Sequence, residues 1–273
     1  MNSRSNSTSE PDKIMECPIC SDTMTVPIIQ CEVGHPMCQS CVTANNVRSC
    51  PICRGPMTNR RMLPLEQLIE SIKDKLLVPC FFHTKGCQYT MKIEHKYEHE
   101  SQCRYRNFKC EGKVFALWDC QWMGDYKDLY NHFKQVHKNT SMQYRTEANL
   151  KINFQSNHRD VQLISFFNGQ SYFYYKHMVD VTRQKLYFTF QYVGLKSSAK
   201  NYYYEFEVHQ GPVRKFKVTE ICESDVVRAE DIFDSEKCVV MSFATAKTFL
   251  NSQGELPFKF RIMSSKKGDS KRI

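Results

Sequence analysis

The sequence predicts a multidomain protein in which small, metal-stabilised α+β modules precede an all-β antiparallel sandwich. Two observations lead to this fold class. Twelve of the 14 cysteines lie between Cys17 and Cys120, interspersed with histidines, and only Cys222 and Cys238 lie beyond them. After residue 139, aromatic and β-branched residues alternate with polar ones, as is typical of half-buried strands. A length of 273 residues allows two or three such domains.

The composition gives no sign of membrane insertion or export. No run approaches the roughly 18 apolar residues that a spanning helix needs, and residues 1–13 lack the apolar core of a secretory signal. We expect these residues to form a disordered tail. We also expect a reducing compartment, the cytoplasm with the nucleus as a second location, where disulfides rarely persist. Clustered cysteines then indicate metal sites.

The first cluster of potential ligands follows the spacing C-x2-C-x10-C-x3-H-x2-C-x2-C-x8-C-x2-C. Its members are Cys17, Cys20, Cys31, His35, Cys38, Cys41, Cys50 and Cys53. Zinc prefers four tetrahedral sulfur or nitrogen ligands, so eight ligands in four pairs predict two closed sites. A segment this short cannot bury enough apolar surface to fold alone, and metal must supply much of its stability. Spacing alone leaves the pairing of the four pairs open.

This ordering resembles the RING finger, and the resemblance covers residues 14–56. It implies cross-bracing, in which the first and third pairs share one zinc ion and the second and fourth pairs share the other. It further implies that Ile19, Val47 and Pro51 contact a ubiquitin-conjugating E2 enzyme, and that Arg54 contacts both E2 and ubiquitin. Such a contact acts by positioning, not by acid–base chemistry. The alternative is a zinc module with a structural role only.

Residues 57–79 are expected to form a helical linker, because Leu65, Leu68, Ile69 and Ile72 recur at helical spacing after Pro64. Residues 80–138 then contain two further ligand sets with similar spacing. The first set is Cys80, Cys87, His99 and Cys103, and the second set is Cys110, Cys120, His132 and His137. They predict tandem zinc fingers of the Cys3His and Cys2His2 types.

A nucleic-acid-binding function is a weaker alternative. The formal charge is +9, but twelve zinc-bound thiolates and four zinc ions would lower it to +5. The loops between the paired cysteines hold six and nine residues, longer than in the usual DNA-reading finger. The segments expected to form the finger helices mix acidic and basic residues. We therefore expect protein partners, with no nucleic acid and no membrane.

Residues 139–263 are expected to form the sandwich, followed by a basic tail at 264–273. The alternation places Leu186, Phe188 and Phe190 on one face of a strand, and residues 202–208 repeat the pattern. Residues 244–250 are expected to form a short helix. Cys222 and Cys238 could carry ubiquitin as thioesters. Acidic residues around Cys222 would raise its pKa and oppose thiolate chemistry, and Cys238 begins an apolar run that favours burial, so we expect structural roles for both.

The whole layout, from Cys17 to about residue 262, resembles the seven-in-absentia (Sina/Siah) family of RING-type E3 ubiquitin ligases. The resemblance implies four structural zinc ions and a TRAF-like sandwich that binds degron peptides of protein substrates and forms a homodimer, or a heterodimer with a relative. It implies ubiquitin transfer to substrate lysines and proteasomal degradation, with no covalent ubiquitin intermediate on this chain. The alternative is a catalytically silent adaptor or dimer partner.

Two segments depart from the family pattern, the Cys41–Cys50 interval and the stretch between Cys110 and Cys120. Neither departure removes a ligand. The region of residues 148–180 also departs, so the groove residues of the family cannot be transferred one by one. Tyr172–Val179 is the candidate strand for an extended peptide.

Overall fold

The computed structural model describes residues 15–265 apart from 73–76, 139, 144 and 167–168. The chain divides into two compact units, Met1–Glu98 and His99–Ile273. The predicted tail at 1–13 and most of the predicted basic tail at 264–273 lie outside the described residues. Among the described helices, none is long and apolar enough to cross a membrane.

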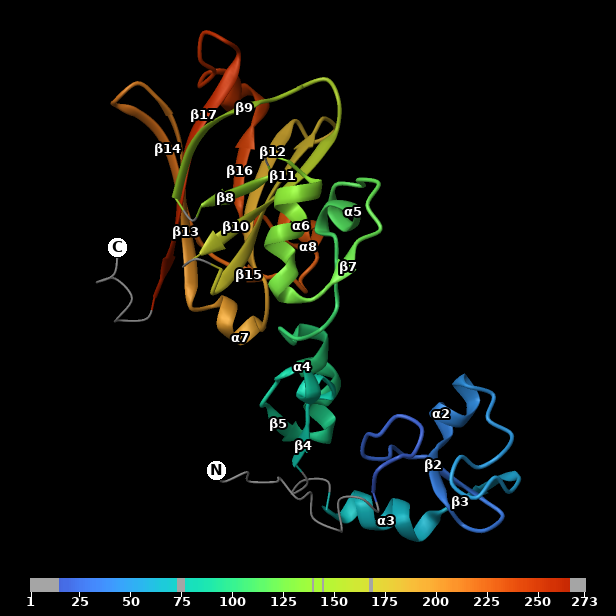
Figure 1. The fold of residues 1–273 in the computed structure, drawn as a ribbon. Coiled ribbons are helices and arrows are strands. Elements are labelled where there is room, and N and C mark those ends of the chain that lie inside the picture. The colour runs from blue at the N-terminus through green and yellow to red at the C-terminus, as the bar shows by residue number, and fades with distance from the viewer. Residues whose placement is uncertain (1–14, 73–76, 139, 144, 167–168, 266–273) are drawn as a thin grey trace, which may run out of the picture. The chain divides into compact units, whose positions relative to one another are not determined.

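The first unit begins with a small module built on a three-stranded sheet (Figure 1). The strand order is β2 (Pro36–Cys38), β1 (Ile28–Cys31) and β3 (Met57–Arg61), and helix α2 (Gln39–Ala44) follows β2. Both strand pairs are antiparallel. The apolar core is small and centres on Met24, Ile28 and Met37. Such a core cannot hold the module together alone, so the cysteine groups must contribute to its stability.

The predicted helical linker, residues 57–79, is helical only over α3 (Leu63–Ile72) in the part that the structure describes. Residues 57–61 form β3 instead, so the first module extends beyond residue 56. The apolar stripe of α3 packs on this module through the buried Ile69, and the buried Glu66 accepts the Ile28 N–H at 2.8 Å. The helix is therefore an integral part of the first module.

The first finger segment contains β4 (Leu77–Pro79) paired with β5 (Thr90–Lys92), the short 3-10 helices η1 (Phe81–Lys85) and η2 (Ile93–His95), and α4 (Lys96–Gln102). Gly86 ends η1 with a φ of 111°, in the left-handed region where only glycine is unstrained. The turn at this glycine leads directly into Cys87, whose N–H donates to Phe82 O at 3.2 Å.

The second unit contains the second finger and the sandwich. The finger consists of β6 (Phe108–Lys109) paired with β7 (Met123–Gly124), the helix α5 (Glu111–Phe115), the 3-10 helix η3 (Tyr126–Asp128) and the helix α6 (Leu129–Val136). Tyr126, Leu129 and Phe133 are buried, and they belong to a cluster that includes residues of the sandwich. The finger is therefore packed against the sandwich.

The sandwich consists of a six-stranded and a four-stranded sheet (Figure 1). The first sheet holds β8 (Ser141–Gln143), β10 (His158–Phe166), β11 (Ser171–Asp180), β12 (Lys185–Tyr192), β15 (Glu223–Ser224) and β16 (Val239–Ser242). The second holds β9 (Arg145–Lys151), β13 (Tyr202–Gln210), β14 (Arg214–Ile221) and β17 (Glu255–Ser264). Short helices α7 (Lys196–Ala199), α8 (Ala229–Asp234) and α9 (Phe243–Lys247) lie in the connections, and α9 confirms the helix expected near 244–250.

Most strand pairs are antiparallel, as expected; among the residues that the structure describes, only β8 with β10 and β12 with β15 are parallel. The core between the sheets includes Leu186, Phe188 and Phe190, which the alternation of β12 placed on one face. The opposite face of β12 is also buried, because Tyr187 packs on Phe233 of α8. The expectation of half-buried strands is therefore wrong for the centre of the first sheet.

Candidate metal centres

The structure brings the sixteen predicted ligands together in four groups, and within each group the ligand atoms lie within 4.8 Å of one another. The groups are Cys17, Cys20, Cys38 and Cys41; Cys31, His35, Cys50 and Cys53; Cys80, Cys87, His99 and Cys103; and Cys110, Cys120, His132 and His137. The first two groups interleave along the chain, which is the cross-braced arrangement that the resemblance implied.

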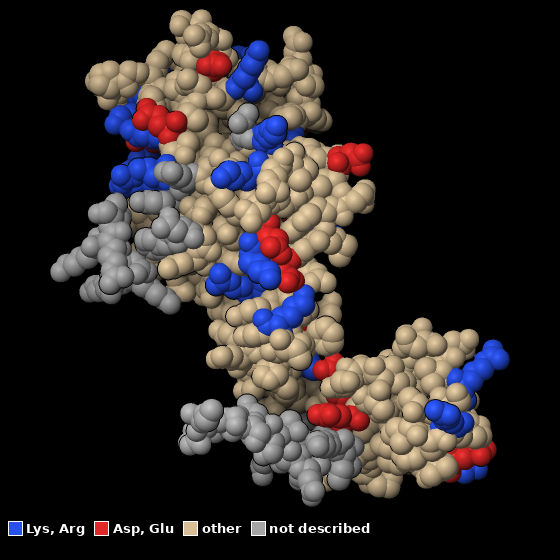
Figure 2. All heavy atoms as spheres, viewed as in Figure 1, with Lys and Arg blue, Asp and Glu red and all other residues tan. Residues whose placement is uncertain are grey.

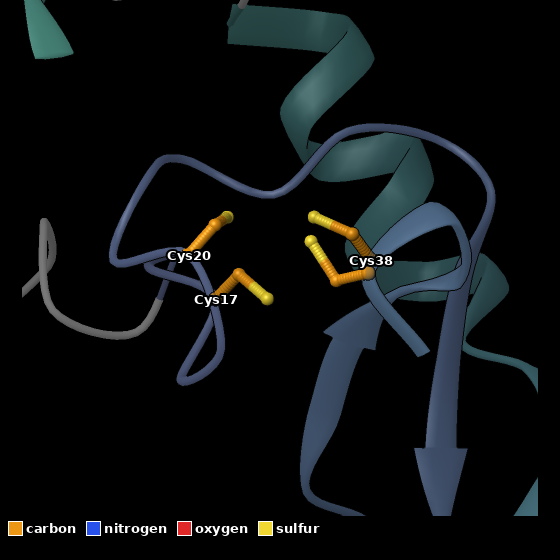
Figure 3. A group of neighbouring side chains, drawn as sticks. Cys17, Cys20 and Cys38 are labelled. Carbon is orange, nitrogen blue, oxygen red and sulfur yellow. The ribbon is translucent and has the colours of Figure 1, made fainter. Parts of the chain in front are cut away.

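In the first group, Cys17 and Cys20 project from one loop toward Cys38, and their sulfur atoms point into a common space (Figure 3). The Thr25 N–H donates to Cys38 Sγ at 3.3 Å. Burial, together with the negative charges of Cys17 and Cys20, raises the pKa of Cys38 to about 11. Such crowded thiols ionise together only when a cation compensates their charge.

In the second group, His35 Nδ1 lies 3.4 Å from Cys31 Sγ and 3.7 Å from Cys50 Sγ. Cys31 and Cys53 are 3.8 Å apart, sulfur to sulfur. Although burial opposes it, the backbone N–H and the ring of His35 lower the pKa of Cys31 to about 6. The sulfur of Cys31 is thus prepared to bind as a thiolate, the form that coordinates metal.

The third and fourth groups use the same local devices. The backbone N–H groups of Phe82 and Tyr105 donate to Cys80 Sγ at 3.4 Å and to Cys103 Sγ at 3.5 Å. In the fourth group, His137 Nε2 lies 3.3 Å from Cys110 Sγ, and His132 Nε2 lies 3.7 Å from Cys120 Sγ. Burial, helped by His137, lowers the pKa of His132 to about 4, which favours the neutral imidazole that binds metal.

These distances fit zinc. Tetrahedral bonds of about 2.3 Å to sulfur and 2.0–2.1 Å to nitrogen separate two sulfurs by about 3.8 Å, and a sulfur from a nitrogen by about 3.5 Å. The separations in the second and fourth groups lie at or near these values. Four protein ligands close each group, so the zinc ions are structural and leave no open position for catalysis.

The four residues predicted to contact E2 lie on loops of the first module. Pro51 and Arg54 are exposed, whereas Ile19 and Val47 are half-buried. Arg54 has a φ of 59°, and its N–H donates to Cys50 O at 2.8 Å. The turn that contains Cys50 and Cys53 therefore fixes the backbone of Arg54 and the position of its Cβ atom. Their contact with E2 stays a prediction.

Sequence reasoning missed Ile52, which is 55% exposed in the last knuckle. The signal was present, because residues 17–20 and 50–53 have the same sequence, Cys-Pro-Ile-Cys. A large apolar side chain held out to solvent beside the exposed Pro51 adds to a contact surface of the kind that binds a protein partner.

Two further sequence hypotheses are settled by burial and pairing. Cys222 and Cys238 are buried, and burial raises the pKa of both thiols, that of Cys238 to about 12. Structural roles are therefore confirmed over thioester chemistry. The choice of Tyr172–Val179 as the peptide-binding strand is wrong, because β11 is paired with β10 on one side and with β12 on the other.

The described charges do not form a continuous basic surface on the face that Figure 2 shows. On the face shown in Figure 2, basic and acidic side chains of the described residues are interspersed. On the outer face of the second sheet, Glu205 pairs with Arg261 at 2.6 Å and with Lys217 at 3.1 Å. A protein that follows a phosphate backbone presents basic residues along one face.

A cross-braced double zinc module, two further zinc fingers and a β-sandwich together define a multi-zinc RING protein with a TRAF-like domain. Three family models agree: "E3 ubiquitin-protein ligase sina/sinah, RING finger" matches residues 17–53, "Sina, zinc finger" residues 71–150, and "Sina, TRAF-like domain" residues 164–260. The chain belongs to the seven-in-absentia family.

Curated relatives carry the same name. The E3 ubiquitin-protein ligase sina of Schistosoma mansoni is 36% identical over 50% of this chain and 34% of its own length. The putative E3 ubiquitin-protein ligase SINAT1 of Arabidopsis thaliana is 31% identical over 72% and 63%. The human E3 ubiquitin-protein ligase SIAH2 is 29% identical over 89% and 74%. The chain thus spans between a third and two thirds of the Schistosoma and Arabidopsis relatives.

Proposed function

We propose that this chain is a RING-type E3 ubiquitin ligase. Its RING recruits a ubiquitin-charged E2, and its C-terminal domain holds a protein substrate whose lysines receive ubiquitin, which leads to proteasomal degradation. The observation that carries the proposal is the first module, where two interleaved ligand groups support an exposed Pro51 and Arg54. The names of the relatives point the same way.

The chain contributes to ubiquitin transfer by positioning. A guanidinium donates several hydrogen bonds in a fixed fork, so Arg54 is suited to hold E2 and ubiquitin in one relative orientation. Its backbone is fixed by the bond to Cys50 O, which reduces the freedom lost on binding. The zinc ions maintain this geometry. Ubiquitin passes from the E2 thioester directly to the substrate lysine, without a thioester intermediate on the buried Cys222 or Cys238.

We place the substrate degron at the edge of β10. This strand is paired with β11 along its length, but β8 pairs with it only at Leu163–Ser165. Within the described residues, no strand pairs with the outer edge of β10 over residues 158–162. An extended peptide can add to such an edge through backbone hydrogen bonds. Dimerisation with a second copy or a relative, in the cytoplasm and nucleus, completes the proposal.

Self-ubiquitination by the purified, zinc-loaded chain with E1, a panel of E2 enzymes, ubiquitin and ATP tests the ligase. We expect E2-dependent ladders that Ile19→Ala and Arg54→Ala abolish while four zinc ions per chain are retained. Arg60→Ala is the matched control, because it removes an exposed arginine of the same module without touching a knuckle. Equal ladders from all four proteins would contradict the positioning role of Ile19 and Arg54.

The second candidate is a silent adaptor, or the dimer partner of an active ligase. The departure in the Cys41–Cys50 interval favours it, since this loop carries Val47. A folded chain with four zinc ions that gives no ladder with any E2 would support this candidate. Mixing that chain with an active relative should then restore ladders.

A further inference from the structure

The chain has two tryptophans, and both lie on histidine ligands of the fourth metal centre. The Trp122 ring stacks on His132 with a centroid distance of 4.3 Å and an interplanar angle of 7°. The Trp118 ring lies on His137 at 4.6 Å and 41°. The two tryptophans flank the ligand Cys120, two positions before and two positions after it. Each histidine of the group therefore has its own indole cover.

Glycines provide the space for both indoles. A Cβ on Gly112 would come within 1.9 Å of Trp118 Cε3, and a Cβ on Gly124 within 2.5 Å of Trp122 Cζ2. Neither glycine has a positive φ, so the backbone does not require glycine at these positions. Gly112 is the second residue of α5. A side chain at position 112 would therefore displace the Trp118 indole.

Backbone hydrogen bonds connect the tryptophans to the ligands. The Cys120 N–H donates to Trp118 O at 3.0 Å, and the Cys110 N–H donates to Trp122 O at 3.2 Å. The Trp118 N–H in turn donates to Gly112 O at 3.0 Å. The ring positions are therefore fixed by the same turns that present the two thiolates.

His132 shows why an indole is needed. Its Nε2 faces Cys120, while its Nδ1 is buried and has no hydrogen-bond partner among the described residues. A metal-binding histidine ordinarily donates from its second nitrogen to a carboxylate or carbonyl, and this bond fixes the ring. Here the parallel face of Trp122 is what limits rotation of the ring.

We propose that Trp118 and Trp122 are positioning residues of the fourth metal centre. They hold the two imidazoles in the orientation that binds zinc, and they restrict the approach of water and chelators. The second RING centre differs, because Cys53 is exposed and, within the described residues, no aromatic ring lies on His35. Zinc leaves the fourth centre later than it leaves that RING centre.

Zinc release from the full zinc-loaded chain into excess EDTA, followed with a colorimetric zinc dye, tests the proposal. We expect Trp122→Leu and Trp118→Leu to release one of four ions about tenfold faster, the lower end of the effect of losing an outer-shell partner. Trp122→Phe and Trp118→Phe should stay near the unmodified rate, because phenylalanine keeps a flat ring on the imidazole. Tyr203→Leu, on the outer face of the second sheet, is the control.

A second readout uses the unmodified chain and so does not depend on a variant that folds. Indole emission should change in one phase that matches the loss of one zinc ion, and the phase should persist in Cys50→Ser, which lacks a RING ligand. Leucine variants that release every ion at the unmodified rate would overturn the proposal. Emission that follows the RING zinc, or phenylalanine variants as fast as leucine variants, would do the same.

Discussion

Replacing Lys176 with methionine tests whether buried ion pairs fasten the second finger to the sandwich. Lys176 lies in the middle of β11, and its Nζ is 2.6 Å from the carboxylate of Glu111, the first residue of α5. The two side chains are only 2% and 14% exposed. Arg106 makes a second pair with Asp225 in the same unit. The finger is thus joined to the sheet by charges as well as by apolar contacts.

The expected cost follows from burial. Burial raises the pKa of Glu111 even though Lys176 acts in the opposite direction, so desolvation outweighs the attraction in this pair. Removing one partner of a buried pair leaves an uncompensated charge and costs about 3–5 kcal/mol. Replacing both with apolar residues, as in Lys176→Met with Glu111→Leu, is often close to neutral. We expect the double variant to recover most of the stability that the single variant loses.

Urea unfolding of the zinc-loaded chain, followed by indole emission, measures the loss, because both tryptophans lie in the second finger. The matched control is Arg261→Met, which removes a cation 2.6 Å from Glu205 at a side chain that is 45% exposed. An exposed pair contributes at most about 1 kcal/mol. A Lys176→Met variant no less stable than Arg261→Met, or a double variant less stable than both single variants, would refute the reasoning.

Three other changes separate the modules. Cys50→Ser should remove one of four zinc ions, measured by zinc analysis, and abolish the ubiquitin ladders. The midpoint of the urea transition that indole emission follows should stay unchanged, because this ligand lies in the RING. Cys110→Ser should lower the midpoint of that same transition, because Glu111 follows the lost ligand directly and pairs with β11; an unchanged midpoint would mean that the finger is dispensable. Ile52→Ala should weaken E2-dependent ladders several-fold with zinc content unchanged, since the exposed side chain does not bind metal; undiminished ladders would exclude it from the E2 surface.

The ligand groups could be read from the sequence because their chemistry is local. A thiolate knuckle needs two cysteines at short spacing and backbone N–H groups that point at sulfur, as at Cys50, where the Ile52 N–H donates at 3.4 Å. The alternation of β12 and β13 was equally legible, because one face of each strand meets the other sheet. In both cases the residues that determine the structure are the residues that form the pattern.

The parts that could not be read depend on what packs against a strand. The run from Tyr172 to Val179 is buried on both faces because the second finger covers its outer side. The residues of this run alone do not indicate that a finger packs on them. The Tyr172 N–H, for example, donates to Tyr126 Oη at 3.0 Å, 46 residues earlier. An aromatic strand that suggested a peptide groove is therefore an interior strand.

Because the second finger packs on the sandwich, the fourth zinc ion contributes to the stability of the sandwich as well as of the finger. A finger of about 30 residues folds only with its metal, and in this chain the folded finger also covers the outer face of a central sheet. Phe133 of α6 lies against Tyr174 at 6.1 Å, and Phe115 of α5 lies against Phe233 of α8 at 6.1 Å. Losing the ion would expose these aromatic side chains of the sandwich. In our proposal the two tryptophans help to retain the zinc ion, and the buried Lys176–Glu111 pair joins the finger to the sheet. Both sets of contacts therefore help to keep the proposed substrate-binding half folded.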